Sequence, residues 1–376
     1  MQAPTWQLQS PQRSASGRLW LPVLAVLGTI LVWALVTAQR TANETQVGAD
    51  GLVEAETVRS VAYVVPGERA DVIRIRALDG GPPKTIVAIP HALGLHARGA
   101  ASPTGQLLGV LSVGAPRASA TFSFISTADG NRRNVEGAFD YLSALAWSAD
   151  GGRVALVRSE APDSAGRIDA HIFEVATSTA LAFELASFER VLEAAPVGYR
   201  SGGELLVAVV DQSGSALWAV TAEGTEFAAA LSAGRTLSWR LDHDGSRLAY
   251  LELSGPGRVA SGRTLLLRTG EIVREPGAGG AHIGVAWPPN AATARFGGPG
   301  GTLVATAVGM SGTYVVPHRW SPDGTTLAAT LVISQTDGSV VLSPELVTPS
   351  SRQRLADEPD ARFLGWVANE RDRGSP

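Results

Sequence analysis

The chain of 376 residues contains no cysteine, and Lys84 is its single lysine among 31 basic residues. Without thiols it has no disulfide, no thiol catalysis, no cysteine-ligated zinc and no attached haem. It also lacks the G-x-S-x-G, H-E-x-x-H, Walker-type and S-x-x-K patterns of common enzymes. We therefore expect no catalytic residue, no cofactor and no metal site from its local motifs.

Positive charge is not concentrated anywhere along the chain. The formal net charge is −4, and it becomes −6 when Arg13 and Arg18 near the N-terminus are left out. Nucleic-acid-binding surfaces need clustered basic residues, so this composition argues against a nucleic-acid partner. Scarce lysine beside abundant alanine and glycine is typical of a high-GC bacterial genome.

A short pattern occurs three times: a tryptophan, a turn with Asp-Gly, and an alternating apolar strand. Glycine closes such a turn with a positive φ, and aspartate bonds to the local N–H groups. The tryptophan is large enough to fill the gap between neighbouring units. We therefore assign a structural role to the repeated positions, which are Trp147, Asp150, Gly151, Trp239, Asp244, Gly245, Trp320, Asp323 and Gly324.

Weaker copies extend this series on both sides, and one of them has Tyr199 at the aromatic position. Successive copies start about 35–55 residues apart, which is the period of a four-stranded propeller blade. The sequence predicts an all-β propeller over residues 57–368, with seven four-stranded blades, or alternatively six. Strands near 57–65 and 363–367 are left over at the two ends, and we expect them to pair and close the ring.

The segment Trp320-Ser-Pro-Asp-Gly324, followed by Leu327-Ala328, resembles the TolB-type (WD40-like) propeller repeat, as does its near-copy at 147–155. The resemblance covers most of residues 57–368. It implies protein–protein interaction at the bacterial envelope, and it assigns no catalytic residues. The middle copy departs from the pattern with Leu241-Asp-His-Asp-Gly245, which predicts a longer corner there.

Residues 19–38 form a run of twenty residues without a charge. A helix of this length spans the hydrocarbon core of a bilayer, which predicts an uncleaved signal-anchor helix. Arg13 and Arg18 bias residues 1–18 toward the cytoplasm and the propeller toward the outside. A cleaved signal peptide ending at Ala38 is the alternative. Residues 39–56 are expected to be a polar linker, and 369–376 a disordered tail.

Two groups of arginines are candidate partner-binding residues. Arg132 and Arg133 are expected in a polar loop between strands. The other four each lie close to the start of a repeat, where a ring of guanidinium groups would suit an anionic ligand or a partner's carboxylates; they are Arg98, Arg200, Arg240 and Arg319. The alternative is that these four arginines have a structural role, in which they stack on tryptophan and pair with acidic neighbours.

Histidines and carboxylates give no metal pattern. Asp242-His243-Asp244 is the densest group of possible ligands, and we interpret it as turn capping because Ca²⁺ needs six or more oxygens. The remaining histidines are spread singly, and most of them are expected at strand ends or on the surface; they are His91, His96, His171, His282 and His318.

The sequence therefore predicts a membrane-anchored, extracytoplasmic propeller that is a protein-binding scaffold or sensor, with an unidentified envelope or membrane protein as its partner. The alternative is an enzyme, a hydrolase or lyase for a sugar or lactone at the central channel. Acidic or histidine side chains meeting at the axis with shifted pKa values would favour it. A third class is a receptor for a solute or lipid, which would need a deep apolar pocket.

Overall fold

The computed structural model describes residues 60–368 except 117, 160–167, 186–190, 255–258, 276–281, 290, 299–312, 335–339 and 359. The predicted membrane helix at 19–38, the linker at 39–56 and the tail at 369–376 lie outside the described residues. Within the described part, no helix is long and apolar enough to cross a membrane.

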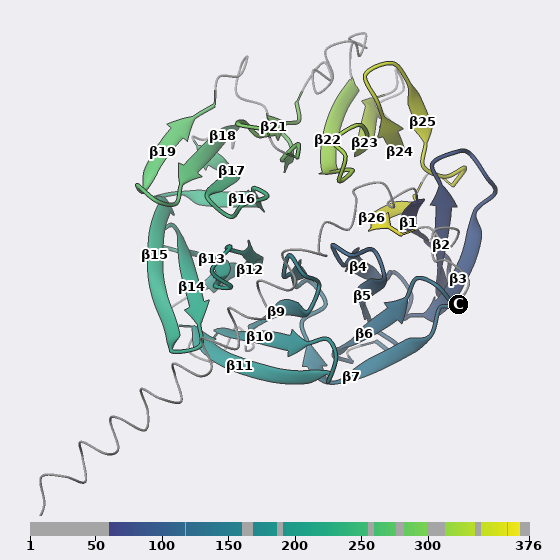
Figure 1. Ribbon diagram of the computed structural model, residues 1–376, viewed down its shortest axis with the longest axis horizontal. Coiled ribbons are helices and arrows are strands. Elements are labelled where there is room, and N and C mark those ends of the chain that lie inside the picture. The colour runs from purple at the N-terminus through teal and green to yellow at the C-terminus, as the bar shows by residue number, and fades with distance from the viewer. Residues whose placement is uncertain are drawn as a thin grey trace, which may run out of the picture. The chain divides into compact units, whose positions relative to one another are not determined.

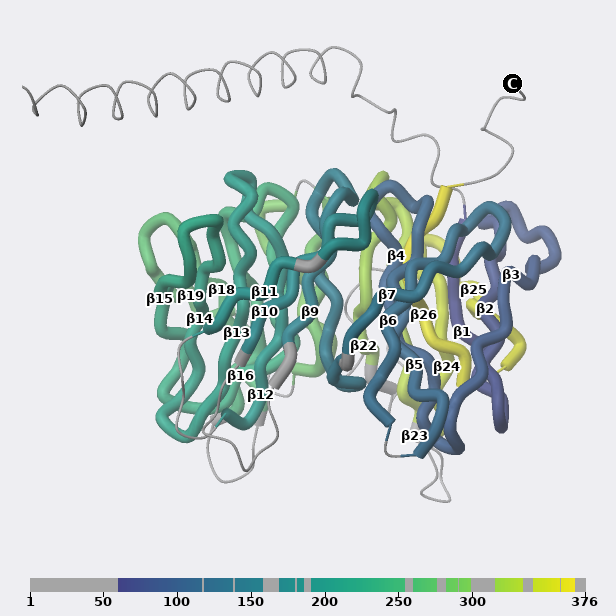
Figure 2. The backbone as a smooth tube through the Cα atoms, turned by 90° about the horizontal axis from the view of Figure 1, so that it is seen from below, coloured from purple at the N-terminus to yellow at the C-terminus, as the bar shows by residue number. Residues whose placement is uncertain are grey.

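The described chain forms antiparallel sheets arranged around a common axis (Figure 1). Six of these sheets have four strands, and we call them blades 1 to 6. Seen from the side, their strands run along the axis (Figure 2).

Blade 1 joins the two ends of the described chain, and blades 2 and 3 follow it. Blade 1 consists of β26 (Arg362–Val367), β1 (Ser60–Val65), β2 (Ala70–Ala77) and β3 (Lys84–Pro90). Blade 2 consists of β4 (Arg98–Ala101), β5 (Leu107–Ser112), β6 (Ala120–Ser126) and β7 (Arg132–Phe139). Blade 3 consists of β8 (Ala146–Trp147), β9 (Arg153–Ser159), β10 (Ile168–Glu174) and β11 (Thr179–Leu185).

The other blades continue around the axis. Blade 4 consists of β12 (Val191–Tyr199), β13 (Leu205–Asp211), β14 (Ser215–Thr221) and β15 (Gly224–Ser232). Blade 5 consists of β16 (Arg235–Leu241), β17 (Arg247–Ser254), β18 (Val259–Leu266) and β19 (Glu271–Arg274). Blade 6 consists of β22 (Thr313–Trp320), β23 (Leu327–Ser334), β24 (Val340–Val347) and β25 (Arg352–Arg354).

A two-stranded sheet lies between blades 5 and 6. It pairs β20 (Val285–Ala286) with β21 (Arg295–Phe296), and β20 contacts both β16 and β22. The described residues thus contain six four-stranded blades, which is the lower of the two counts expected. Residues 276–281 and 299–312, which flank this sheet, lie outside the described part, so a seventh four-stranded blade stays a prediction.

The ring is closed by the pairing of β26 with β1, as the sequence predicts. Ser60 pairs with Val367, and Ala62 pairs with Gly365. The strand nearest the axis in blade 1 therefore comes from the C-terminal end of the described chain, and the other three strands come from its N-terminal end. Residues far apart in sequence form a single sheet in this way.

Tryptophans fill the gaps between blades. Trp147 packs with Leu111 and Phe122 of blade 2 and with Val154 of its own blade, and its indole N–H donates to the carbonyl oxygen of Ala100 at 3.2 Å. Trp287 makes the equivalent bond to the carbonyl oxygen of Arg240 at 2.8 Å. Each such bond ties one sheet to the first strand of the blade before it: Trp147 of blade 3 to blade 2, and Trp287 after β20 to blade 5.

The Asp-Gly corners connect the first and second strands of a blade. The amide of Ser148 donates to the carbonyl of Arg153 at 2.9 Å, Asp150 accepts from the amide of Gly152 at 2.9 Å, and Gly151 has a φ of 71°. Gly245 and Gly324 also have a φ of 71°. The same amide-to-carbonyl bond, reaching five residues ahead, forms in three other blades; its donors are Ser102, Asp242 and Ser321.

Two expectations for blade 5 are wrong. Its corner is no longer than the others, because Asp242 takes the place of the serine and bonds to Arg247 with the same spacing. Trp239 does not occupy the place of Trp147 and Trp320. Leu241 does, since it directly precedes the corner, and a register shift between Leu237 and Arg240 moves the tryptophan. Trp239 still packs between blades 4 and 5.

Closure depends on a glycine in β26. A Cβ at Gly365 would lie 2.4 Å from the Cβ of Ala101, and its φ is 155°. We expect Gly365→Ala to lower the free energy of unfolding by about 1–3 kcal/mol, the usual effect of overpacking. Gly114→Ala is the matched control, because its Cβ would meet nothing within 4 Å. Urea denaturation measures both variants, and equal stability of the two would contradict this account of closure.

Candidate functional site

The first strands of the blades surround the axis (Figure 1). One residue in each of them, and one in β20 of the two-stranded sheet, directly precedes the aromatic or apolar position next to the corner, so these seven residues share one level. We call this set the axial ring. Strand pairing and the tryptophan bonds identify its members as Gly365, Ala100, Ala146, Gly198, Arg240, Ala286 and Arg319.

Five members of the axial ring are glycine or alanine, and two are arginine. Arg240 in β16 and Arg319 in β22 lie on either side of Ala286 in β20, which contacts both strands. Small residues suit the close approach of neighbouring blades: a Cβ at Gly198, for example, would meet Leu241 at 3.3 Å. The two arginines are therefore departures from the repeat, and packing at this level does not account for them.

Arg240 and Arg319 have no acidic partner within the described chain. None of the ion pairs between described residues includes either side chain. One guanidinium nitrogen of Arg240 donates to the carbonyl oxygen of Trp239 at 2.9 Å. Both side chains are exposed to solvent, yet protein surrounds them. This enclosure lowers the pKa of both guanidinium groups, and the charge of Arg319 lowers the pKa of Arg240 further.

His318 lies beside the arginine pair. Burial lowers the pKa of His318 to about 4, and the charge of Arg240 contributes to this shift. Its Nε2 lies 2.7 Å from the hydroxyl of Thr330, and its ring stacks on Phe363 of β26 with centroids 6.2 Å apart. The imidazole is thus neutral at physiological pH, and the net charge of the group comes from the two arginines.

The other two arginines of the expected ring lie at other levels. Arg98 is two residues before the axial ring position of β4 and lies over the ring of Tyr141 at 5.7 Å. Arg200 follows β12 and forms an ion pair with Glu204 at 2.6 Å. The structure therefore brings together Arg240 and Arg319. Of the other two candidates, Arg98 stacks on an aromatic ring and Arg200 pairs with an acidic neighbour, as the alternative interpretation expects.

Arg132 and Arg133 lie at the start of β7 and not in a loop, so that part of the prediction is wrong. Nε of Arg132 donates to the hydroxyl of Ser123 at 3.0 Å, and Arg133 donates to the carbonyl oxygens of Val175 and Ala176 in the next blade. Pairing of β7 with β6 extends the strand to Arg132. Both side chains make contacts within the propeller, and their binding of a partner stays a prediction.

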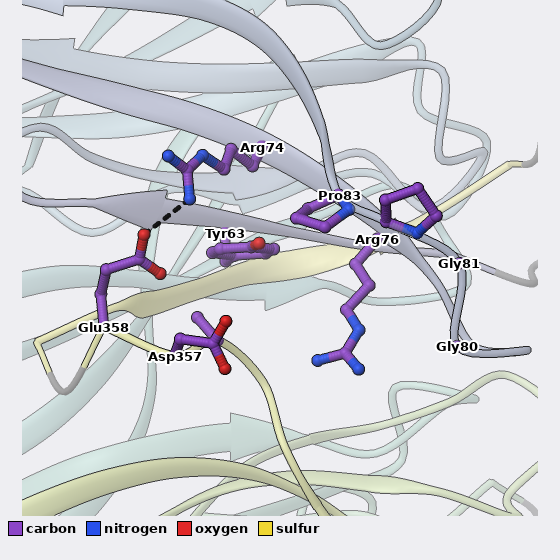
Figure 3. A pocket seen from close by; sticks show the side chains of 10 residues that line it. Tyr63, Arg74, Arg76, Gly80, Gly81, Pro83, Asp357 and Glu358 are labelled. Atoms are coloured by element: carbon purple, nitrogen blue, oxygen red, sulfur yellow. Dashed lines mark hydrogen bonds and ion pairs between the residues drawn. The ribbon is translucent and has the colours of Figure 1, made fainter.

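A small pocket of about 190 Å³ lies between blades 1 and 6 (Figure 3). Arg74 forms an ion pair with Glu358 at 2.6 Å across it, and Arg76 donates to the carbonyl oxygen of Arg354 at 2.9 Å. Burial raises the pKa of Tyr63 in its wall. Ligand pockets usually measure about 300–1,000 Å³, so we interpret these contacts as part of the closure of the ring.

A group of side chains that could hold a metal ion lies where the sequence did not indicate one. Asp242 accepts from the amides of Ser246 and Arg247 and from the guanidinium of Arg247, which is turn capping. Asp71, His91 and His96, in contrast, have ligand atoms within 4.8 Å of one another. We expected His91 and His96 to be isolated. The H-x4-H spacing of His91 and His96 lies within the range of zinc ligands, but the third residue, Asp71, comes from β2 and is brought in by strand pairing.

No family model matches the chain, and neither does any curated protein. The fold matches solved β-propellers. Acylaminoacyl peptidase from Pyrococcus horikoshii is 13% identical, with 80% of this chain and 51% of that one covered, at a TM-score of 0.53. The β-propeller domain of the Trilobed protease from Pyrococcus furiosus is 12% identical, with 80% of this chain and 99% of that one covered, at a TM-score of 0.50. TolB from Acinetobacter baumannii is 14% identical, with 82% of this chain and 67% of that one covered, at a TM-score of 0.49.

These matches show a β-propeller and no more. The chain spans about half the length of the peptidase it matches. At such low identities a shared fold does not carry an activity with it. Function has to be argued from the residues of this chain.

The arginine pair predicts an unusual response to charge removal. Replacing one of two like charges removes repulsion, so we expect Arg319→Gln to raise the free energy of unfolding by about 0.5–1 kcal/mol at low salt, and less at high salt. Arg200→Gln is the control, because it removes a paired charge and should destabilise by less than about 1 kcal/mol. Denaturation at two salt concentrations tests this, and a stability loss in Arg319→Gln that does not depend on salt would refute it.

His318 predicts a dependence of stability on pH. Its ordinary pKa of 6.5 falls to about 4 in the folded protein, so between these values the unfolded chain binds a proton that the folded chain does not. This contribution to stability is complete above about pH 6.5 and is lost as pH falls toward 4, by at most about 3 kcal/mol. His318→Asn should lack it, while His243→Gln, at an exposed corner, should keep it. The test is the difference in unfolding free energy between about pH 7 and about pH 4.5.

Proposed function

We propose that this chain is a membrane-anchored, extracytoplasmic propeller that binds another protein of the cell envelope, and that it receives a carboxylate of that protein at Arg240 and Arg319. The observation that carries the proposal is the pair of guanidinium groups without an acidic partner among the described residues. The uncharged run at 19–38 supports anchoring, and the arginines that precede it support export of the propeller.

The chemistry of the pair fits an oxyanion. Arginine presents a planar set of donors that matches a carboxylate with two parallel hydrogen bonds. Each hydrogen bond to a charged group contributes about 1.5–3 kcal/mol. A carboxylate seated between Arg240 and Arg319 also offsets their mutual repulsion, which makes the propeller more stable in the complex than alone.

The groups around Arg240 and Arg319 favour a binding function over the enzymatic alternative. A hydrolase or lyase of the kind expected would place carboxylates or titrating histidines at the axis. In the part of the chain described here, the groups that interact electrostatically with Arg240 and Arg319 are each other and His318, and His318 is neutral. This set can hold an anion, and it offers no general acid at neutral pH.

The test is chemical crosslinking of the full chain in its native membrane, followed by mass spectrometry of the crosslinked proteins. We expect one envelope protein to be crosslinked to the wild-type chain in stoichiometric amount. Its yield should fall at least about tenfold in the Arg240→Gln/Arg319→Gln variant, the loss expected when two charge-assisted contacts are removed.

Arg200→Gln is the matched control, because its guanidinium already pairs with Glu204, and it should capture the partner as the wild type does. Crosslinking that is equal in the double variant and the wild type would move recognition away from the arginine pair. The absence of any crosslinked envelope protein would overturn the scaffold itself.

A further inference from the structure

Asp71, His91 and His96 meet where the chain passes from blade 1 to blade 2. Asp71 is the second residue of β2, His91 directly follows β3, and His96 lies two residues before β4. Pairing of β2 with β3 sets Asp71 opposite Ile89, so the connection at 91–97 passes over the carboxylate. The potential ligand atoms of the three side chains lie within 4.8 Å of one another.

This cluster is buried at its base and open on one side. The side chains of Asp71 and His91 are 0% exposed, and that of His96 is 24% exposed. Backbone amides hold the carboxylate in place: Oδ1 accepts from Gly67 at 3.0 Å, and Oδ2 accepts from Ala97. A buried carboxylate fixed in this way has the orientation that the second shell of a metal site provides for its ligands.

The hydrogen bonds of His91 leave one of its nitrogens unsatisfied. Nδ1 lies 2.8 Å from the carbonyl oxygen of Ala92, to which only an N–H can donate. In a neutral imidazole the proton is therefore on Nδ1, and Nε2 carries a lone pair. Nε2 is buried and makes no hydrogen bond, although it lies 3.0 Å from Oδ1 of Asp71. In that neutral form two electron pairs face each other, and either a second proton on His91 or a metal ion between the two atoms relieves the repulsion.

Histidine ligands of metals typically donate their other N–H to a backbone carbonyl, as His91 does. The distances also fit. Nδ1 of His96 lies 2.9 Å from the same carboxylate oxygen, and tetrahedral ligands with bonds of about 2.0–2.1 Å lie about 3.3 Å apart. Separations of 2.9 and 3.0 Å thus need to widen by only a few tenths of an ångström.

We propose that Asp71, His91 and His96 bind a divalent transition-metal ion of the Zn²⁺ class, through Oδ1, Nε2 and Nδ1 respectively. On binding, the proton that Nδ1 of His96 donates to Asp71 moves by way of solvent to Nε2, so the imidazole stays neutral and Nδ1 offers its lone pair to the ion. Two imidazoles and one carboxylate leave a position for water there, which is a ligand set that zinc accepts. The ion ties the start of β2 to the connection between blades 1 and 2. The proposal is independent of the arginine pair.

Zinc and cobalt are the probes. The purified full chain, with a tag that lacks histidine, is stripped with EDTA, desalted and titrated by calorimetry with Zn²⁺, and the Co²⁺ form is recorded by visible absorption. We expect one ion per chain, a d–d band typical of nitrogen and oxygen ligands in low-coordinate Co²⁺, and a Tm rise of about 4 °C or more at a hundredfold excess of Zn²⁺ over Kd.

His96→Gln should weaken Zn²⁺ binding at least about 100-fold and abolish the cobalt band, since it removes one of three protein ligands. Because His96 is partly exposed, this variant should still fold, and circular dichroism checks that it does. Asp71→Asn keeps the shape of the carboxylate and should also lose the ion. His243→Gln, an exposed histidine at the corner of blade 5, is the control and should bind Zn²⁺ as the wild type does.

Two results would overturn the proposal. One is that wild-type protein binds neither ion stoichiometrically, and nitrogen NMR shows a proton on Nε2 of His91, which would make the cluster a buried imidazolium–carboxylate pair. The other is that His96→Gln and Asp71→Asn bind Zn²⁺ as tightly as the wild type, which would assign the ion to other surface groups.

Discussion

The pairing of β26 with β1 is the contact on which the rest of the molecule depends. Blades pack only on their neighbours, so an open ring would leave the faces of blades 1 and 6 in water. Closure is a long-range contact, and it is reinforced by the Arg74–Glu358 ion pair. It also supplies Gly365, without which β26 could not approach Ala101 so closely. The axial ring has a defined geometry because this one strand completes the circle.

Once the ring is closed, the repeat gives equivalent positions equivalent surroundings. Glycine and alanine at five axial positions follow from the close packing of neighbouring blades. Arg240 and Arg319 depart from this pattern, and their packing gives no reason for it. Both side chains reach solvent, but partial desolvation by the surrounding protein and their like charges still disfavour the charged pair when no anion is present. Function in a repeat fold is therefore best sought where the repeat is broken, and in this chain the break is a pair of positive charges.

Features that depend on interactions between residues close in sequence could be predicted, and features that depend on strand pairing could not. The corners at Asp150 and Asp323 form from hydrogen bonds within five residues, so their turns are visible in the sequence. The place of Trp239 depends on a register shift in β16, which a Trp–Asp-Gly pattern does not show. Arg200 was grouped with Arg240, although Glu204 four residues later neutralises it. Asp71 and His96 meet because strand pairing and a connection between blades bring them together over 25 residues.

The two unusual clusters differ in sign and in place. Arg240 and Arg319 lie at the axis, near the corners that join the first and second strands. Asp71 lies near the opposite end of the strands, beside the β1–β2 turn, since Val72 pairs with Val65 whereas the ring residue Gly365 pairs with Ala62. Among the described residues, Arg240 and Arg319 have no acidic partner, and Nε2 of His91 has no hydrogen bond. A buried nitrogen without a hydrogen bond is an exception in proteins, whereas two like charges side by side favour an anion, so the two clusters suit different partners. A carboxylate bound by the arginines at the axis does not occupy His91 and His96, and a metal ion bound there leaves the axis free for a partner protein.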